Sequence, residues 1–226
     1  SSDLWDVNFS IPKGQLVAVI GPNGAGKSSL LKALLGIIKP LSGKILFFGK
    51  SHKKAQKKVA YVPQRNCVDW DFPITVFDVV LMGCYGKRGL LRRIKQEDRD
   101  LVKDALRQVG LEGFEKRQIS ELSGGQQQRV FIARALVQEA EVYLMDEPFA
   151  AVDASTERSL MELLQKLVKE GKTVLIVHHN LASVSKHFDY ALVLNITLIS
   201  CGKVQEAFSQ KHLEEAYGGT PPCIGE

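Results

Sequence analysis

Cysteine is scarce in this chain, and the four that occur stand far apart, at Cys67, Cys84, Cys201 and Cys223. None belongs to a Cys-x-x-Cys pair, so the spacing is not that of a zinc site. A chain of 226 residues can bury enough apolar surface to fold without a disulfide framework. We therefore expect four reduced thiols in a cytosolic protein.

Long apolar runs are missing as well. The longest apolar tracts, such as residues 173–177 and 190–194, fall far short of the roughly 18–20 residues that a membrane-spanning helix needs. The first residues, Ser-Ser-Asp-Leu, lack the basic stretch and apolar segment of a signal peptide. Hydrophobic residues make up 45% of the chain and charged residues 24%, which is typical of a soluble globular protein.

Positive charge is in excess, with a net charge of +5. Basic residues gather at 50–58 and 87–95. Such clusters are typical of a solvated face, of a nucleic-acid contact, or of a surface near anionic lipid headgroups. No aromatic residues interleave them, which disfavours the nucleic-acid interpretation.

Short apolar runs alternate with helical patterns along most of the chain, which favours a parallel sheet covered by helices on both faces. We predict strands over 15–20, 44–48, 59–63, 142–145, 173–177 and 191–194, and helices over 27–35, 75–82, 97–109, 126–138, 155–170 and 212–217. Gly36 is a plausible stop for the first of these helices.

Residues 65–120 break the alternation, because they carry two helical patterns and no convincing strand. We predict a single domain over 1–226, with a catalytic core at about 1–64 and 121–217 and an inserted helical lobe at about 65–120. The tail, 218–226, is rich in Gly and Pro and is expected to be poorly ordered.

A phosphate-binding loop is the first decisive motif. It reads Gly21-Pro22-Asn23-Gly24-Ala25-Gly26-Lys27-Ser28, with Ser29 following. Glycines let successive backbone N–H groups point at phosphate oxygens, and the helix that follows adds its positive N-terminal end. Lys27 is expected to reach the β- and γ-phosphates of ATP, and Ser28 to place its hydroxyl on Mg²⁺.

Two adjacent acids, Asp146 and Glu147, end the apolar run 142–145. Since neighbouring side chains on a strand point in different directions, Asp146 can face Mg²⁺ while Glu147 faces the attacking water. On its own this pair is a weak signal, and a helix cap or solvated pair is as plausible. Behind a phosphate loop, the catalytic interpretation is favoured.

A second anion-binding device follows at Leu122-Ser123-Gly124-Gly125-Gln126, before a predicted helix. One triphosphate has no obvious need for two phosphate-binding helix ends. A head-to-tail dimer, in which each such loop completes the other chain's ATP site, resolves this. At this point the sequence resembles the ATP-binding-cassette (ABC) family, whose signature is LSGGQ.

The resemblance covers nearly the whole chain and implies a P-loop NTPase (RecA-like) core, with a mainly parallel sheet, an antiparallel β part and an inserted helical subdomain. It implies that Gln64 is the Q-loop glutamine, which senses the γ-phosphate, joins Ser28 and Asp146 at the metal, and links the site to the membrane subunits. It makes Asp153 the D-loop aspartate and His179 the switch histidine. The neighbouring His178 is the alternative to His179, because the family more often has Thr there.

Family members usually carry an earlier strand and an adenine-stacking aromatic residue upstream of Leu4. Trp5 is the nearest aromatic here, and its spacing predicts a core residue of the first strand. Adenine stacking is therefore expected to be incomplete in this chain.

Several phrases resemble the manganese, iron and zinc importer branch of the family. They are Asp69-Trp70-Asp71-Phe72-Pro73, the doubled His178-His179, Leu194-Asn195 and Ala216-Tyr217-Gly218-Gly219. The branch implies an ATPase on the cytoplasmic face of a bacterial membrane. Its partners are a permease, a second copy of the chain and, indirectly, a periplasmic or lipoprotein metal-binding protein.

Other interpretations compete with metal import. The first alternative is an ATPase of another importer class.

Residues 73–83 are expected to help couple the ATPase to the permease, although plain helix packing explains them nearly as well. A soluble cassette acting on DNA or ribosomes is disfavoured by the single cassette without heptad insertion, so no nucleic-acid partner is expected. A cassette without hydrolysis is disfavoured because Lys27, Asp146, Glu147 and His179 are all present.

Overall fold

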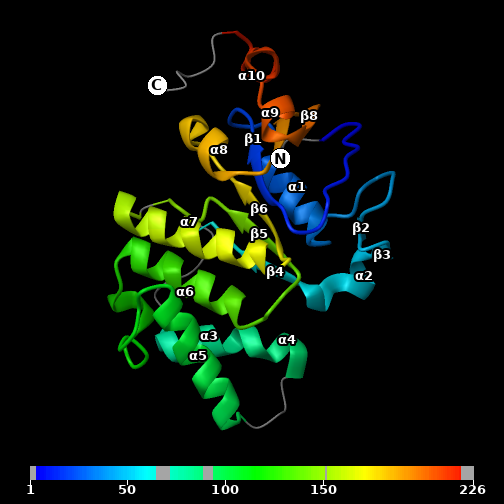
Figure 1. The fold of residues 1–226 in the computed structure, drawn as a ribbon. Helices are drawn as coiled ribbons and strands as arrows, with labels where there is room; N and C mark the ends of the chain where they lie inside the picture. Colours follow the sequence, from blue (N-terminus) through cyan, green and yellow to red (C-terminus); the bar gives the residue numbers. More distant parts are fainter. Residues whose placement is uncertain (1–3, 65–71, 89–93, 151, 220–226) are drawn as a thin grey trace.

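A six-stranded sheet lies at the centre of the computed structural model, which describes residues 4–64, 72–88, 94–150 and 152–219 (Figure 1). The strand order is β4-β5-β6-β1-β7-β8, and every neighbouring pair is parallel except β7 and β8. The strands are β1 (Leu16–Ile20), β4 (Val59–Val62), β5 (Val142–Asp146), β6 (Thr173–Val177), β7 (Tyr190–Asn195) and β8 (Thr197–Lys203). The predicted mainly parallel α/β sheet is confirmed.

The central strands form because their residues suit a surface buried on both sides. All five residues of β1, β5 and β6 are buried, and continuous apolar runs of this kind are typical of parallel strands covered on both faces. A separate antiparallel ribbon pairs β2 (Leu46–Phe47) with β3 (Lys50–Ser51). This ribbon accounts for the predicted antiparallel part together with β8.

Two apolar clusters cover the two faces of the sheet. Val17 and Val19 face one cluster together with α1 (Lys27–Leu34). Leu16, Ala18 and Ile20 face the other, with α6 (Gly124–Leu136) and α7 (Ala154–Lys169). Helices α1 and α6 therefore lie on opposite sides of the sheet (Figure 1).

The helical segment around 76–121 packs onto the second face through α6. It contains α3 (Val76–Leu81), η3 (Met82–Cys84), α4 (Tyr85–Arg88), α5 (Gln96–Gln108) and η4 (Ile119–Glu121). In η3, a Cβ on Gly83 would lie 2.2 Å from the Arg134 carbonyl oxygen of α6, so only glycine allows this close approach. Among the described residues of this segment the β pairing is a single bridge, Thr75 with Gln118. Its status as a separate lobe stays a prediction.

The remaining helices are short: α2 (His52–Ala55), η1 (Gln56–Lys58), α8 (Leu181–His187), α9 (Val204–Ala207) and α10 (Gln210–Tyr217). The sequence pattern missed β3, β8, α2, α4, α8 and α9. Strand β8 is a half-exposed edge strand containing Gly202, so it lacks the continuous apolar run that marks the inner strands. Within the described ranges, no helix is long and apolar enough to cross a membrane.

The predicted placement of Trp5 in a first strand is wrong. Residues 4–15 carry no strand, and the Trp5 side chain is 63% exposed. Its backbone N–H donates to the Ile196 carbonyl (3.0 Å). The neighbouring Leu4, not Trp5, is the side chain that packs inward, against Gly26.

Two smaller predictions can be checked against the described residues. Gly36 has a φ of 72° just past α1, as expected of a helix stop. Cys84 and Cys201 are free thiols, while Cys67 and Cys223 lie outside the described residues. Gly218 ends α10 in the left-handed conformation, and the rest of the predicted tail, from 220, is not described.

Candidate functional site

The candidate site lies where four parallel strands end. Gly21 follows β1, Asp146 closes β5 and Glu147 follows it, His178 and His179 follow β6, and Gln64 lies two residues past β4. Because β4, β5, β6 and β1 are neighbours running in one direction, their carboxyl ends meet at one edge of the sheet. Such an edge is the usual ligand site of an open α/β sheet.

The phosphate loop curls around the Lys27 ammonium group. Gly24 and Gly26 have φ angles of 83° and 91°, which favour glycine. Lys27 Nζ donates to the carbonyls of Gly21 and Pro22, each at 2.8 Å. Burial lowers the pKa of Lys27, whereas the nearby carboxylates of Glu147 and Asp146 raise it. The loop therefore presents a largely desolvated cation to whatever it binds.

The other loop residues predicted to bind phosphate differ in their exposure to solvent. Asn23 and Gly24 are exposed at the tip, and Ala25 is buried. Ser28 and Ser29 are half-buried in the first turn of α1. Their place at a helix N-terminus suits an anion.

Asp146 and Ser28 form a pair that fits a hard divalent cation. Asp146 is buried, and a hydrogen bond from the Ser28 side chain favours its ionised form, although burial raises its pKa overall. Its Oδ1 atom is buried and has no hydrogen-bond partner among the described residues. A buried carboxylate oxygen without a donor, next to a hydroxyl, is a suitable ligand set for Mg²⁺.

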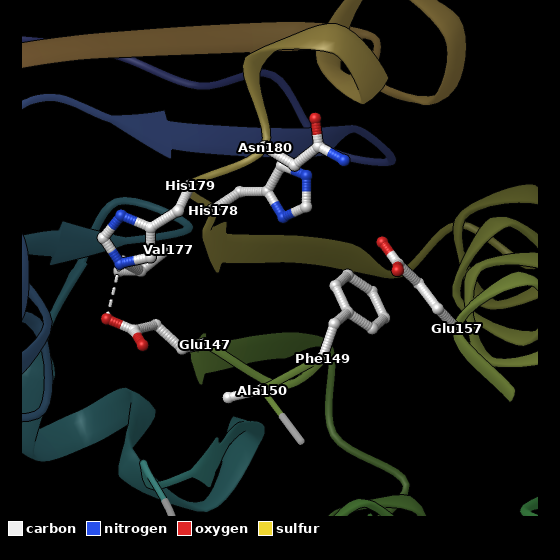
Figure 2. Close-up of a pocket in the computed structure, with 8 residues that line it drawn as sticks. All are labelled: Glu147, Phe149, Ala150, Glu157, Val177, His178, His179 and Asn180. Atoms are coloured by element: carbon white, nitrogen blue, oxygen red, sulfur yellow. Dashed lines mark hydrogen bonds and ion pairs between the residues drawn. The ribbon is translucent and has the colours of Figure 1, made fainter. Parts of the chain in front are cut away.

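Glu147 is held between two predicted site residues from neighbouring strands. Gln64 Nε2 donates to Glu147 Oε2 (3.0 Å). On the other side, His179 Nε2 lies 2.6 Å from Glu147 Oε1, the contact drawn as a dashed line in Figure 2. Glu147 itself has a φ of 49°, so the chain turns sharply after Asp146. The two acids point apart mainly through this turn, and strand alternation alone is not the reason.

The doubled histidine divides into two roles. Figure 2 shows the His179 ring directed at Glu147 and the His178 ring directed the other way, toward Phe149. His178 is buried between Phe149 and Phe188, with ring centroids 5.8 and 5.3 Å away, and its Nε2 contacts Ser183 Oγ at 2.5 Å. Of the two histidines, His179 therefore faces Glu147 and His178 belongs to the apolar packing; the role of His179 as the switch histidine stays a prediction.

His178 makes the fold sensitive to acid. Burial lowers its pKa from 6.5 to about 4, so between these values the unfolded chain binds a proton that the native chain does not. Native stability is therefore complete near neutral pH and falls as the pH drops through this window. Acidification from pH 7 to pH 5 is expected to cost about 2 kcal/mol through this group.

This prediction is checked by measuring the free energy of unfolding of wild type and His178→Gln at both pH values. Gln cannot be protonated, so the variant is expected to lose about 2 kcal/mol less on acidification than wild type. Equal acid sensitivity in the two proteins would contradict a buried neutral His178.

The predicted signature loop begins α6. Ser123 is the N-cap, Gly124 and Gly125 form the first turn, and the helix starts two residues earlier than predicted. Ser123 Oγ accepts from Gln126 N (3.4 Å) and Gln126 Oε1 accepts from Ser123 N (2.9 Å), a capping box. Since α6 and α1 cover opposite faces of the sheet, the two helix ends that the sequence predicts to bind anions belong to different sides of the chain.

Asp153 caps another helix. Its carboxylate accepts from the backbone N–H groups of Ser155 and Thr156 at the start of α7. Hydrogen bonds from these two residues hold the pKa of Asp153 well below its usual range. The structure therefore places the predicted D-loop aspartate at a helix start, and Ala151 before it lies outside the described residues.

A cavity of about 200 Å³ lies beside Glu147 and His179. It is lined by Glu147, Phe149, Ala150, Glu157, Val177, His178, His179 and Asn180 (Figure 2). Phe149 went unnoticed at the sequence level, although its place two residues after Glu147 on the same loop is the signal that could have found it. The cavity gives Glu147 an approach on the side of His179.

A buried lysine in a glycine-rich strand–loop–helix, a buried Asp–Ser pair and a glutamate directly after that aspartate together define a P-loop nucleotide hydrolase. The chain belongs to the ABC transporter family, which matches residues 4–150. It is an ATPase of the ATP-binding-cassette type.

Its relatives and structural neighbours agree with this class. The zinc transport system ATP-binding protein TroB of Treponema pallidum (strain Nichols) is 54% identical over 96% of this chain and 81% of the relative. The manganese transport system ATP-binding protein MntB of Bacillus subtilis (strain 168) is 52% identical over 96% and 86%. The dimeric ATP-binding cassette MJ0796 bound to ADP and Pi superposes with a TM-score of 0.79, at 30% identity over 89% of this chain and 90% of that one.

Proposed function

We propose that this ATPase powers the uptake of a transition-metal ion, manganese or zinc first among them, through a separate membrane permease. The observation that carries the proposal is the gathering of Lys27, Asp146, Glu147 and His179 at one sheet edge, in a chain about half identical to subunits named for zinc and manganese transport. The cargo itself is expected to be handled by the permease and an external binding protein.

The proposed chemistry assigns one task to each group. Lys27 exchanges its contacts with the Gly21 and Pro22 carbonyls for β- and γ-phosphate oxygens. Ser28, Asp146 and Gln64 would hold Mg²⁺, which would neutralise charge on the phosphates, and Gln64 would also meet the γ-phosphate. Glu147 takes the proton of the attacking water while His179 holds the carboxylate in place (2.6 Å).

The signature loop is proposed to act on a second copy of the chain. Ser123, Gly124, Gly125 and Gln126 begin a helix on the face of the sheet opposite α1, so they are poorly placed to serve their own phosphate loop. In a head-to-tail dimer they meet the γ-phosphate held by the partner. The dimeric state named for the MJ0796 cassette supports this arrangement. Asp153 lies at the start of α7 and is proposed to face the same dimer contact.

The proposed location is the cytoplasmic face of a bacterial membrane, where ATP is available and a permease can be reached. Phe72 and Met82, both exposed at 62% and 45%, flank α3 and suit a contact with that permease. These partners follow from the family and not from any bound molecule.

Transport by the reconstituted complex tests the proposal. The chain and the permease that co-purifies with it would be placed in lipid vesicles, and ATP-driven movement of Mn²⁺, Zn²⁺ and Fe²⁺ would be measured. We expect the wild-type complex to transport one or more of these ions. The complex carrying Lys27→Ala is expected to transport none of them. Active ATP hydrolysis without movement of any of the three ions would overturn metal import and favour another importer class.

A further inference from the structure

Charge is divided unevenly along this chain. Residues 7–64 hold ten of its 30 basic residues and none of its 25 acidic ones, so the remaining residues are acidic on balance although the whole chain carries +5. A separation of this kind is typical of proteins that meet a nucleic acid or an anionic membrane surface. Any such contact has to use lysines that are exposed and have no acidic partner.

Four of the ten lysines have another partner or place. Lys13 and Lys58 both pair with Glu141, and Lys27 and Lys32 belong to α1. No ion pair joins any of the other six to an acid in the part of the chain that the structure describes. We refer to these six exposed residues as the lysine surface: Lys39, Lys44, Lys50, Lys53, Lys54 and Lys57.

The lysine surface lies on segment 39–57, which follows α1 and leads into β4. In Figure 1 the β2–β3 ribbon and α2 project from the side of the molecule opposite α7. The inner side of this segment is apolar, since Ile45 and Phe47 pack against the cluster that contains α1. On α2, Ala55 is buried, and the His52 ring lies 6.1 Å from the Phe47 ring. The segment is therefore held to the body by these side chains, and its lysines are left in solvent.

Exposed aliphatic side chains accompany the lysines. Leu41 is fully exposed, and Ile37 and Leu46 are 67% and 58% exposed. Exposure alternates over residues 44–48, so Leu46 leaves the ribbon on the same face as Lys44. Lysines beside exposed Leu and Ile suit the boundary between anionic headgroups and acyl chains. A single-stranded nucleic acid would instead call for aromatic faces on which its bases stack.

We propose that the lysine surface binds the anionic lipid headgroups of the membrane, as a contact separate from the one with the permease. Clusters of four to eight lysines are sufficient to hold a protein segment at an anionic membrane surface, and Leu41 and Leu46 enter the acyl boundary beside them. The contact turns the segment between α1 and β4 toward the bilayer. It goes beyond the proposed function and does not depend on which ion is carried.

Flotation with lipid vesicles tests the proposal. The purified chain would be mixed with vesicles of phosphatidylcholine, alone or with an equal part of phosphatidylglycerol. Wild type is expected to bind the anionic vesicles, and high salt should weaken this binding. One variant combining Lys50→Gln, Lys53→Gln, Lys54→Gln and Lys57→Gln should bind them on the order of 100-fold more weakly. Its ATP hydrolysis in solution and its thermal unfolding temperature should stay those of wild type.

A matched control makes the same change of net charge elsewhere, through Lys103→Gln, Lys166→Gln, Lys169→Gln and Lys211→Gln. These lysines are exposed and lie on α5, α7 and α10, outside the proposed contact. The control should bind anionic vesicles within roughly threefold of wild type, because charges farther than a Debye length from the membrane are screened.

Three results would overturn the proposal. An equal loss in both variants would show that net charge alone attracts the chain. Failure of wild type to bind anionic vesicles, or equal binding to neutral ones, would rule out the headgroup contact. Tighter binding to duplex DNA than to anionic vesicles at the same salt concentration would assign the lysine surface to a nucleic acid instead.

Discussion

Glu147→Gln is expected to lower kcat for ATP hydrolysis by at least roughly 100-fold while leaving ATP binding intact. Gln keeps the size and the two-atom fork of the side chain, so it can still contact Gln64 and His179. It cannot accept the proton of the attacking water. Because Glu147 lies between Gln64 Nε2 and His179 Nε2, the variant loses the base and keeps the frame around it.

The same variant reports on the dimer. Solution mass by light scattering, with and without MgATP, should show an ATP-dependent dimer that accumulates in Glu147→Gln and is transient in wild type. Glu170→Gln, on the exposed end of α7, is the control and should behave as wild type. Near-normal turnover in Glu147→Gln would remove Glu147 from the role of base. A monomer under every condition would count against the shared site.

Lys27→Ala is expected to weaken ATP binding on the order of 100-fold, since two charge-assisted contacts with phosphate oxygens are lost. The Lys27 side chain is buried and bonded to the Gly21 and Pro22 carbonyls, so the variant also leaves those two acceptors without their donor. The lost phosphate contacts lower the ATP affinity, and the two unpaired carbonyls lower the thermal stability to a smaller extent.

Calorimetric or fluorescence titration with ATP measures this effect. Lys32→Ala is the matched control, because Lys32 is on the same helix and is exposed. Removing its charge changes the local field without touching the loop. Unchanged affinity in Lys27→Ala would rule out the phosphate-cradle role, and an equal loss in Lys32→Ala would show that net charge alone attracts the nucleotide.

The inner strands and the catalytic motifs were predictable because each is encoded locally. Five consecutive apolar residues make β1, four after Thr173 make most of β6, and a glycine-rich run before a helix makes the phosphate loop. The convergence of Gln64, Glu147 and His179 was predictable only through the family resemblance. Which of the two histidines faces Glu147 depended on the burial of His178 between Phe149 and Phe188.

The misses have a common cause in distant contacts. Trp5 was expected in a strand, but its backbone bonds to Ile196, across nearly the whole sequence. Strand β8 exists because β7 pairs with it, and its own pattern of polar and small residues does not predict it. Asn195 bonds to the Ala216 carbonyl only because α10 returns to the sheet next to β7. No local pattern contains these partners.

The Ser123 hydroxyl, which caps α6, can also serve a bound anion. Ser123 Oγ accepts the Gln126 N–H through a lone pair, and a serine hydroxyl also carries a hydrogen that it can donate. The helix cap uses a lone pair of this oxygen as an acceptor, and a phosphate contact would use its hydrogen as a donor. The two contacts therefore do not compete. In the proposed dimer, nucleotide can therefore arrive and depart at every turnover without the first turn of α6 having to unwind and form again.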